Sequence, residues 1–415
     1  MRVGIFSPSY PGVNGTGGIP VYTQSLATGL VQLGHEAHVL IHDSERAGTS
    51  FTVDGVELHA IRPRYARVVS RWLRGVRESV ETSVAALRLC RRFGLDVFEF
   101  PNFDGMGAAF EPLAHYGRRG PPVVVRLHTS LAECLAIEGR PLAVADRFEV
   151  WRERVQCRRA DALTVSTAAH RRHMAEELGV PEERIALLPL GLPDTARPEA
   201  RMPRPRGTPP SIVYVGRLEP RKGVIDLLTA VPAVLGRVPD ARFIFVGADR
   251  PLAPGGMTHA AWLAKNLPPS AQGSVELRGF VDDATREHVV ETADVFVAPS
   301  LYESFGLIFL EAMRLAVPVV GTTAGGIPEV VEDGQNGLLV PPRSPDRIAD
   351  ALVRLLTDEP LRLRLAAEGR RTFAERFSSR AMAERTLAHH EELLSGAARG
   401  GRGRAPRRGA NGRGA

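Results

Sequence analysis

The sequence predicts an α/β protein with two Rossmann-like domains, whose parallel sheets face each other across a cleft. Three observations support this fold class. Short apolar runs of strand length alternate with helix-length amphipathic segments over most of the chain. A segment with six prolines, 192–210, interrupts this alternation near the middle of the chain. The 415 residues are enough for two domains with separate hydrophobic cores.

The first half of the chain, 1–191, is the predicted N-terminal domain. Its expected strands lie at residues 3–6, 37–41, 96–99, 123–127, 162–165 and 185–188. Helix-length segments fall between these strands, most clearly at 21–33, 67–93 and 147–159. Strands that alternate with helices in this way favour a parallel sheet covered by helices.

The second half repeats the pattern after the proline-rich segment, which is the predicted linker. Its expected strands lie at 212–215, 242–246, 275–278, 295–298 and 318–321. Helical stretches follow at 345–356 and 359–376, and a last one runs from 379 to 394. We therefore place the second domain at 211–376 and a final helical segment at 377–395. Residues 396–415 are rich in glycine and arginine and are predicted to be disordered.

The net charge of +6 does not indicate a nucleic-acid-binding protein. Six arginines without any acidic residue lie in the C-terminal tail, and they account for the whole excess: Arg399, Arg402, Arg404, Arg407, Arg408 and Arg413. The folded body is therefore close to neutral, and we do not expect nucleic acid as a partner.

Other features of the composition predict a cytoplasmic protein. The chain has no run of 18 apolar residues, and the apolar run at its N-terminus ends at Pro8, too early for a signal peptide. Its three cysteines are scattered and lack the spacing of metal ligands: Cys90, Cys134 and Cys157. We expect them to be reduced thiols.

Two glutamates eight positions apart, Glu303 and Glu311, mark the most informative stretch of the sequence. The strand expected at 295–298 ends just upstream, and a helix is predicted from Phe305, so Glu303 lies on the turn and Glu311 about two turns into the helix. The free N–H groups of Phe305, Gly306 and Leu307 would point out of the helix N-terminus, where an anion is favoured. Such a site suits a sugar nucleotide, which offers a phosphate to the backbone and hydroxyls to the carboxylates.

A second cluster of charges follows the strand expected at 212–215. Gly216 lets the backbone approach a ligand closely, and Arg217 and Lys222 lie at the carboxyl end of the strand, where open α/β sheets bind ligands. A guanidinium and an ammonium that converge there suit a diphosphate. The alternative is a surface loop with two solvated bases. The glutamate pair at a similar place in the same domain favours the phosphate site.

The N-terminal domain offers a glycine-rich loop and a histidine. Gly17 and Gly18 lie in a loop between the first strand and the first helix, where backbone N–H groups can face an anionic ligand. A dinucleotide fingerprint is not expected, because Pro20 stands where its third glycine belongs. His128 ends the strand at 123–127. A lone histidine is usually structural, but its place at a carboxyl strand end favours contact with a ligand.

Taken in order, these motifs resemble those of the retaining glycosyltransferases of family 4, which have the GT-B fold. The matching positions are the glycine loop at 15–18, His128, 215–218 with Lys222, the Glu303/Glu311 pair, and 325–329. The resemblance implies that the last helix crosses back to the N-terminal domain. It also implies transfer of a sugar, with retention of configuration, from a nucleoside-diphosphate sugar bound by the C-terminal domain to an acceptor hydroxyl bound by the N-terminal domain.

The resemblance also implies roles for individual residues. Arg217 and Lys222 would hold the diphosphate, Glu303 the donor sugar, and His128 would line the transfer site. Donor binding would involve Gly17, Gly18, Phe305, Gly306, Leu307 and, at the ribose, Glu311. The nucleotide base would lie near Phe280 and Val281.

No metal and no cofactor are expected beside the donor. The sequence contains no Asp-x-Asp triplet, and the basic residues with the helix N-terminus would stabilise the departing diphosphate. The acceptor stays open between a saccharide, a lipid-linked sugar and a small-molecule aglycone. The alternatives are a non-hydrolysing nucleotide-sugar epimerase or a phosphorylase on the same fold, and a non-catalytic sugar-nucleotide sensor.

Residues 63–80 predict a basic amphipathic helix. Apolar residues that include Trp72, Leu73 and Val76 share one face of this helix. Four arginines share the other face: Arg64, Arg67, Arg71 and Arg74. Three interpretations stay open: a helix that packs its apolar face into the core, a helix at the inner face of an anionic membrane, or a site for a phosphorylated acceptor.

Overall fold

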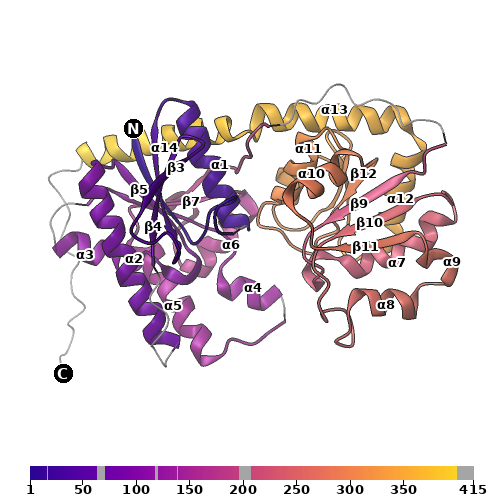
Figure 1. Ribbon diagram of the computed structural model, residues 1–415, viewed down its shortest axis with the longest axis horizontal. Coiled ribbons are helices and arrows are strands. Elements are labelled where there is room, and N and C mark those ends of the chain that lie inside the picture. Colours follow the sequence, from indigo (N-terminus) through magenta and orange to yellow (C-terminus); the bar gives the residue numbers. More distant parts are fainter. Residues whose placement is uncertain (16, 63–70, 117–119, 138, 196–206, 400–415) are drawn as a thin grey trace.

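The computed structural model describes residues 1–15, 17–62, 71–116, 120–137, 139–195 and 207–399. Figure 1 shows two α/β domains side by side, with the last two helices running along one edge of both. Predictions for residues 63–70, for most of the linker and for residues 400–415 lie outside the described residues. Among the described helices, none combines the length and the hydropathy needed to cross a bilayer.

The N-terminal domain is built on a sheet that has eight strands in the described residues, in the order β3-β4-β2-β1-β5-β6-β7-β8. The strands are β1 (Arg2–Ser7), β2 (Glu36–His42), β3 (Ser50–Val53), β4 (Val56–Ile61), β5 (Val97–Pro101), β6 (Val123–Arg126), β7 (Ala162–Val165) and β8 (Ile185–Leu187). Neighbours pair in parallel except for β3 and β4. The six predicted strands are present.

The β3–β4 hairpin was not predicted, although the sequence carries a signal for it. Asp54 and Gly55 connect the two strands with positive φ angles of 51° and 79°. An Asp-Gly pair between two short alternating segments is a strong hairpin signal, because both central residues of that turn need positive φ. The hairpin adds β3 as one edge of the sheet.

The C-terminal domain has a parallel sheet with the order β11-β10-β9-β12-β13-β14. Its strands are β9 (Ser211–Val215), β10 (Arg242–Val246), β11 (Val275–Gly279), β12 (Val295–Val297), β13 (Val319–Thr322) and β14 (Leu338–Val340). This is the doubly wound order in which the chain reverses its direction of progress between the first and fourth strands. Ligands bind at the carboxyl ends of the strands at that switch point, here β9 and β12. The short strand β14 was not predicted.

Helices cover both faces of each sheet, as predicted for parallel sheets. The N-terminal domain carries α1 (Gly18–Gln32), α2 (Arg71–Phe93), α3 (Phe110–Tyr116), α4 (Leu131–Ile137), α5 (Val144–Arg159) and α6 (Ala168–Leu178). The C-terminal domain carries α7 (Val224–Leu235), α8 (His259–Asn266), α9 (Pro269–Gln272), α10 (Asp283–Glu291), α11 (Leu307–Arg314), α12 (Pro345–Thr357) and α13 (Glu359–Arg376). Helix α12, for example, buries Ile348, Leu352 and Leu355 in the core beside α7, and each such side chain contributes about 1.5–3 kcal/mol.

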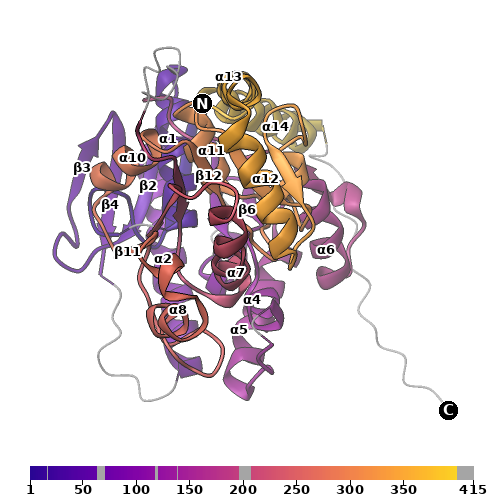
Figure 2. The same cartoon turned by 90° about the vertical axis from the view of Figure 1, so that its right-hand side faces the viewer.

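The chain passes between the domains twice, and the two passages run side by side. The amide of Leu192 donates to the carbonyl of Phe377 at 2.9 Å, and the amide of Ser379 donates to the carbonyl of Leu192 at 2.7 Å. Helix α14 (Ser379–Arg399) then packs on α1 of the N-terminal domain, along the edge seen in Figures 1 and 2. The predicted crossover helix is therefore confirmed. It runs to Arg399, past the predicted end at 395, because its helical pattern continues through Ala397 and Ala398.

Candidate active site

The candidate site lies at the carboxyl ends of β9 and β12, where two loops are held tightly together. The loop after β9 forms a short 3-10 turn, η3 (Pro220–Lys222), and ends at Gly223, whose φ is 67°. A Cβ on Gly223 would overlap the carbonyl oxygen of Pro299 in the loop after β12. The amide of Leu301 donates to the carbonyl of Arg221 at 2.7 Å. The two sequence-predicted clusters, about 80 residues apart, therefore form one site.

An ion pair between Lys222 and Glu303 is the centre of this site. The Lys222 Nζ lies 2.5 Å from Glu303 Oε1, and the side chains are only 14% and 12% exposed. Ser300 Oγ donates to the same carboxylate oxygen at 2.8 Å, and Arg221 Nη1 lies 3.7 Å from Oε2. Burial by itself would raise the pKa of Glu303, but the charges of Lys222 and Arg221 outweigh it and hold the pKa below its usual value. The carboxylate is therefore ionised at neutral pH.

Two basic side chains, Lys222 and Arg221, face this carboxylate, and a third, Arg217, lies nearby on the same loop. Arg217 is at the mouth of the site, with its side chain 70% exposed, and its Nη2 lies 3.4 Å from Glu219 Oε1. Arg221 lies deeper, and its Nε is 2.8 Å from the same Glu219 oxygen. Arg217 and Lys222 were predicted site residues, but Arg221 and Ser300 were missed. Arg221 is next to Lys222 in the sequence, so a further positive charge on this loop could be predicted. The sequence does not show that its side chain points toward Glu303.

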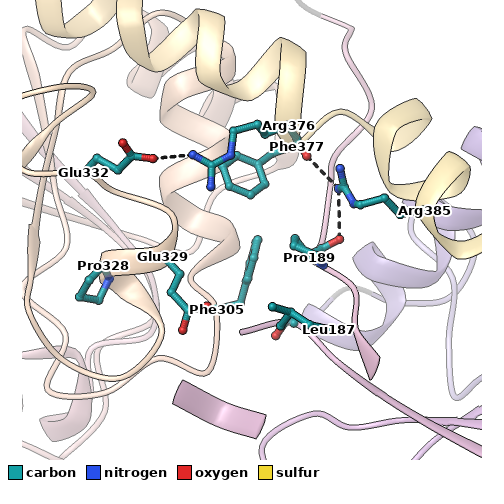
Figure 3. Close-up of a pocket in the computed structure, with 10 residues that line it drawn as sticks. Leu187, Pro189, Phe305, Pro328, Glu329, Glu332, Arg376, Phe377 and Arg385 are labelled. Atoms are coloured by element: carbon teal, nitrogen blue, oxygen red, sulfur yellow. Dashed lines mark hydrogen bonds and ion pairs between the residues drawn. The ribbon is translucent and has the colours of Figure 1, made fainter. Parts of the chain in front are cut away.

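The N-terminus of α11 begins two residues later than predicted. Gly306 is its N-cap with φ 100°, and the helix starts at Leu307 rather than at Phe305. The left-handed conformation of Gly306 ends the loop there and leaves the first N–H groups of the helix without intrahelical acceptors. The Phe305 side chain is buried, with its ring 5.8 Å from that of Phe377 (Figure 3). The backbone of Phe305, which the sequence predicts at the donor, lies directly before this N-cap.

Glu311 lies just over one turn into α11, whose start at Leu307 is later than predicted, and it faces α10. Its Oε2 is 3.8 Å from Nε of Arg286, and the side chain is about a quarter exposed. Burial raises the pKa of Glu311, and the charges of Arg286 and Arg314 oppose that rise. Phe280 precedes the same helix α10 and is exposed, whereas Val281 is partly buried against the core. The predicted ribose and base positions therefore border one helix, α10.

We expect Glu311→Ala to raise the KM for the donor more than it lowers kcat. Contacts to ribose hydroxyls are alike in the ground state and the transition state, so their loss weakens binding without slowing the chemical step. Steady-state kinetics at varied donor concentration measure the two effects. A loss in kcat larger than the rise in KM would mean that Glu311 contacts the reacting sugar instead.

On the N-terminal domain, His128 follows β6 and its backbone is fixed. Its amide donates to Asn102 Oδ1 at 2.7 Å, and Asn102 Nδ2 donates to the His128 carbonyl at 3.1 Å. Burial, with the nearby charges of Arg126 and His170, lowers the pKa of His128 to about 3. The ring is therefore neutral at pH 7, and its buried Nε2 has no hydrogen-bond partner among the described residues. A neutral, unpartnered ring nitrogen is free to bond a ligand.

The glycine loop is brought to His128 by helix α1. Gly17 is the N-cap of α1 and Gly18 its first residue, while Tyr22 in the second turn packs its ring 5.4 Å from the His128 ring. The Tyr22 hydroxyl donates to Glu99, a buried carboxylate, at 2.5 Å. The sequence-predicted residues of the N-terminal domain thus share one face, which meets the other domain where Thr129 Oγ1 and Ser304 Oγ lie 3.1 Å apart.

Two Rossmann-like domains, a returning C-terminal helix and a charged site at the switch point between them define a protein of the GT-B class. Residues 209–358 match the family described as glycosyl transferases group 1, and residues 17–191 match the glycosyl transferase 4-like domain. The chain belongs to this family of glycosyltransferases, known as family 4, and is a transferase.

Individual relatives extend the match over nearly the whole chain. The α-D-kanosaminyltransferase of Streptomyces kanamyceticus is 31% identical over 74% of this chain and 79% of its own. The D-inositol 3-phosphate glycosyltransferase of Corynebacterium jeikeium is 30% identical over 97% of this chain and 99% of its own. The structure of Anabaena HepE in complex with UDP and glucose superposes with a TM-score of 0.67 at 16% identity, over 94% of this chain and all (100%) of that one.

Proposed function

We propose that this glycosyltransferase moves a sugar from a nucleoside-diphosphate sugar to an acceptor hydroxyl, with retention of configuration and without a metal ion. The observation that carries the proposal is the Lys222–Glu303 ion pair beside the N-terminus of α11. A buried ammonium next to free helix N–H groups is suited to a diphosphate that gains charge as it leaves. The adjacent ionised carboxylate is suited to the hydroxyls of the sugar.

Positive charge at this site replaces a metal in the proposed mechanism. Lys222 and Arg221 lie at the floor of the site and Arg217 at its mouth, so that the diphosphate would enter between fixed cations. Preorganised charges of this kind stabilise a developing anion without reorganisation during the reaction.

Retention is best explained by attack of the acceptor on the face that the diphosphate leaves. A covalent intermediate requires a carboxylate with a free oxygen near the sugar. Both oxygens of Glu303 face cations, Oε1 at 2.5 Å from Lys222 and Oε2 at 3.7 Å from Arg221, which lowers their nucleophilicity. We therefore propose front-face transfer in which the leaving phosphate accepts the proton of the acceptor hydroxyl.

The donor is proposed from the relatives as well as from the site. Their names include kanosaminyl and inositol-phosphate glycosyl transfer, and the Anabaena structure holds UDP and glucose. The two transferase names agree on sugar transfer, but one names a transferred sugar and the other inositol 3-phosphate, so they do not give a common acceptor. The acceptor class, whether a saccharide, a lipid-linked sugar or a small-molecule aglycone, is therefore left to experiment.

A thermal-shift screen of UDP-, GDP-, ADP- and TDP-sugars tests the donor, because a ligand that binds only the folded state raises Tm by mass action. The screen is followed by proton NMR of the product, in which retention appears as the anomeric configuration of the donor. Adding EDTA should leave the rate largely unchanged, whereas strict dependence on Mn²⁺ or Mg²⁺ would refute the metal-free mechanism. Epimer formation from donor alone would favour the epimerase alternative.

We also propose that the N-terminal part of α2 contacts an anionic membrane surface. The core-packing interpretation is not supported here, because Leu73 and Val76 are 46% and 40% exposed. Helix α5 lies alongside, where Arg152 Nη1 donates to the Gly75 carbonyl at 2.7 Å, and it adds Trp151, which is 56% exposed. Exposed apolar side chains beside the exposed Arg74 suit a surface that is both apolar and negatively charged.

We expect the protein to co-sediment with vesicles that contain phosphatidylserine at low salt and to be released as the salt concentration rises. Replacing Arg64, Arg67, Arg71 and Arg74 by glutamine should abolish binding, and Trp151→Ser should weaken it at any salt concentration. Vesicles of phosphatidylcholine alone are the control. Wild-type protein that stays in the supernatant at low salt would contradict the membrane proposal.

A further inference from the structure

Hydrogen bonds join the two domains directly beside the candidate site, and we call them the interdomain latch. Glu329 ends the 3-10 turn η4 (Ile327–Glu329) of the C-terminal domain, and its carboxylate accepts from the backbone amides of Ala168 and Ala169 at 2.7 and 2.8 Å. These amides form the N-terminus of α6 in the other domain. Thr167 Oγ1 donates to the Ser304 carbonyl at 2.7 Å.

The electrostatics of the latch favour a contact that is strong when closed and reversible. Each oxygen of Glu329 accepts one N–H that a helix N-terminus leaves without an intrahelical acceptor. Negative charge is favoured at that end of the helix, and charge-assisted bonds are stronger than neutral ones. When the domains separate, water solvates both the carboxylate and the amides, so that opening leaves no buried group unpaired.

The loops that carry the latch also carry the candidate site. Ser304 follows Glu303, and the amide of Gly326 donates to the Glu303 carbonyl at 2.8 Å. A Cβ on Gly326 would lie 2.5 Å from the Ser304 carbonyl, so the two loops are in close contact. On the other domain, Thr129 follows His128 and reaches Ser304 Oγ. The latch therefore sets the position of His128 against Glu303.

A pocket lies between the two domains next to the latch. A pocket of about 390 Å³ is lined by Ser166 and Leu187 of the N-terminal domain and by Phe305 and Glu329 of the C-terminal domain (Figure 3). The facing surfaces of the two domains are therefore not in contact throughout. The paired passages at 191–192 and 377–379 lie beside it and are the natural hinge.

We infer that Glu329 is a positioning residue that closes the N-terminal domain onto the donor site by accepting the amides of α6. The inference rests on the proposed function for its kinetic consequence, but not for the domain contact itself. Loss of the latch lowers the closed population, and with it the fraction of bound donor that faces His128. The nucleotide contacts would persist, because they lie within the C-terminal domain. The expected effect is therefore on kcat, on the order of ten-fold, with little change in donor KM.

The test compares Glu329→Ala with Glu332→Ala. Glu332 is the matched control, since it lies three residues along and lines the same pocket, but its partner at 2.5 Å is Arg376 of the same domain. Small-angle X-ray scattering of the free proteins should give a larger radius of gyration for Glu329→Ala than for wild type or for Glu332→Ala. Thr129→Val, which removes the bond to Ser304, should also increase the radius of gyration.

Scattering profiles of Glu329→Ala that match wild type would refute the latch. An equal loss of kcat in Glu329→Ala and Glu332→Ala would refute it too. If Glu329→Ala does not fold, Glu329→Gln keeps the side chain's size without its charge, and the same comparison applies. A radius that rises in Glu329→Ala while no nucleotide sugar raises Tm would refute the proposed function and leave the latch standing. If the radius of gyration of Glu329→Ala stays unchanged while the wild-type enzyme transfers sugar from a nucleotide sugar, the proposed function stands and the latch is refuted.

Discussion

Replacing Lys222 by alanine is expected to lower the rate of sugar transfer by at least about 100-fold, the usual scale for loss of one preorganised charge at a developing anion. Lys222 is the deepest cation of the site, with its Nζ 2.5 Å from Glu303 and its side chain 14% exposed. No mobile side chain or solvent molecule can restore a fixed charge at that depth. The measurement is kcat/KM with the donor identified by the thermal-shift screen.

Lys265→Ala is the matched control for this variant, because Lys265 is exposed on α8. Loss of Lys222 also removes a partner of a buried carboxylate, and Arg221 at 3.7 Å compensates only in part. Circular dichroism and the melting midpoint must therefore accompany the kinetics. A folded Lys222→Ala protein with near-normal turnover would refute its role at the diphosphate.

Replacing Glu303 by glutamine is expected to lower kcat on the order of 100-fold while donor KM changes much less. Glutamine keeps the shape of the side chain but removes the charge opposite the sugar, where positive charge develops as the diphosphate leaves. Glu332→Gln is the control, since it removes a carboxylate of the same domain from outside the site. A rise in KM without loss of kcat would assign Glu303 to ground-state binding.

The pKa shift of Glu303 also predicts how this variant depends on pH. Its pKa lies below the ordinary value of 4.5 in the folded protein. The carboxylate therefore stabilises the fold above pH 4.5, and this contribution is lost as the pH falls through the lowered pKa. The difference in melting midpoint between wild type and Glu303→Gln should thus be constant from pH 6 to 8 and shrink below about pH 4.

Local patterns in the sequence were enough for the architecture of the sheets. The predicted strands are present because short apolar runs of Val, Ile and Phe bury both faces of a parallel sheet, and this requirement is visible without any partner strand. The missed strands are β3, its hairpin partner β4, whose six residues are mostly buried, and β14. β3 is partly exposed and β14 has three residues, so neither carries a strong pattern by itself.

The site was predicted to the level of its loops, but the directions of individual side chains were not. Glu303 and Lys222 were placed together because carboxyl ends of neighbouring strands share one edge. Phe305 was expected to contribute its backbone at the donor, and the direction of its ring, which packs against Phe377 across the crossover, was not predicted. An aromatic side chain next to a ligand loop can turn either way, and the packing of a helix 70 residues later in the sequence decides the direction.

The sequence by itself determined the two-domain α/β fold and the family, since these depend on patterns within one segment or on motifs in a fixed order, and the return of the last helix was implied by the family resemblance. Only the tertiary structure decided that Arg221 and Ser300 join Glu303, that His128 is neutral, and that Glu329 bonds the first amides of α6. The physical reason is that burial and hydrogen-bond direction are properties of several segments at once. The Glu329 carboxylate, for example, can hold the two domains together only because the N-terminus of α6 in the other domain lies against it.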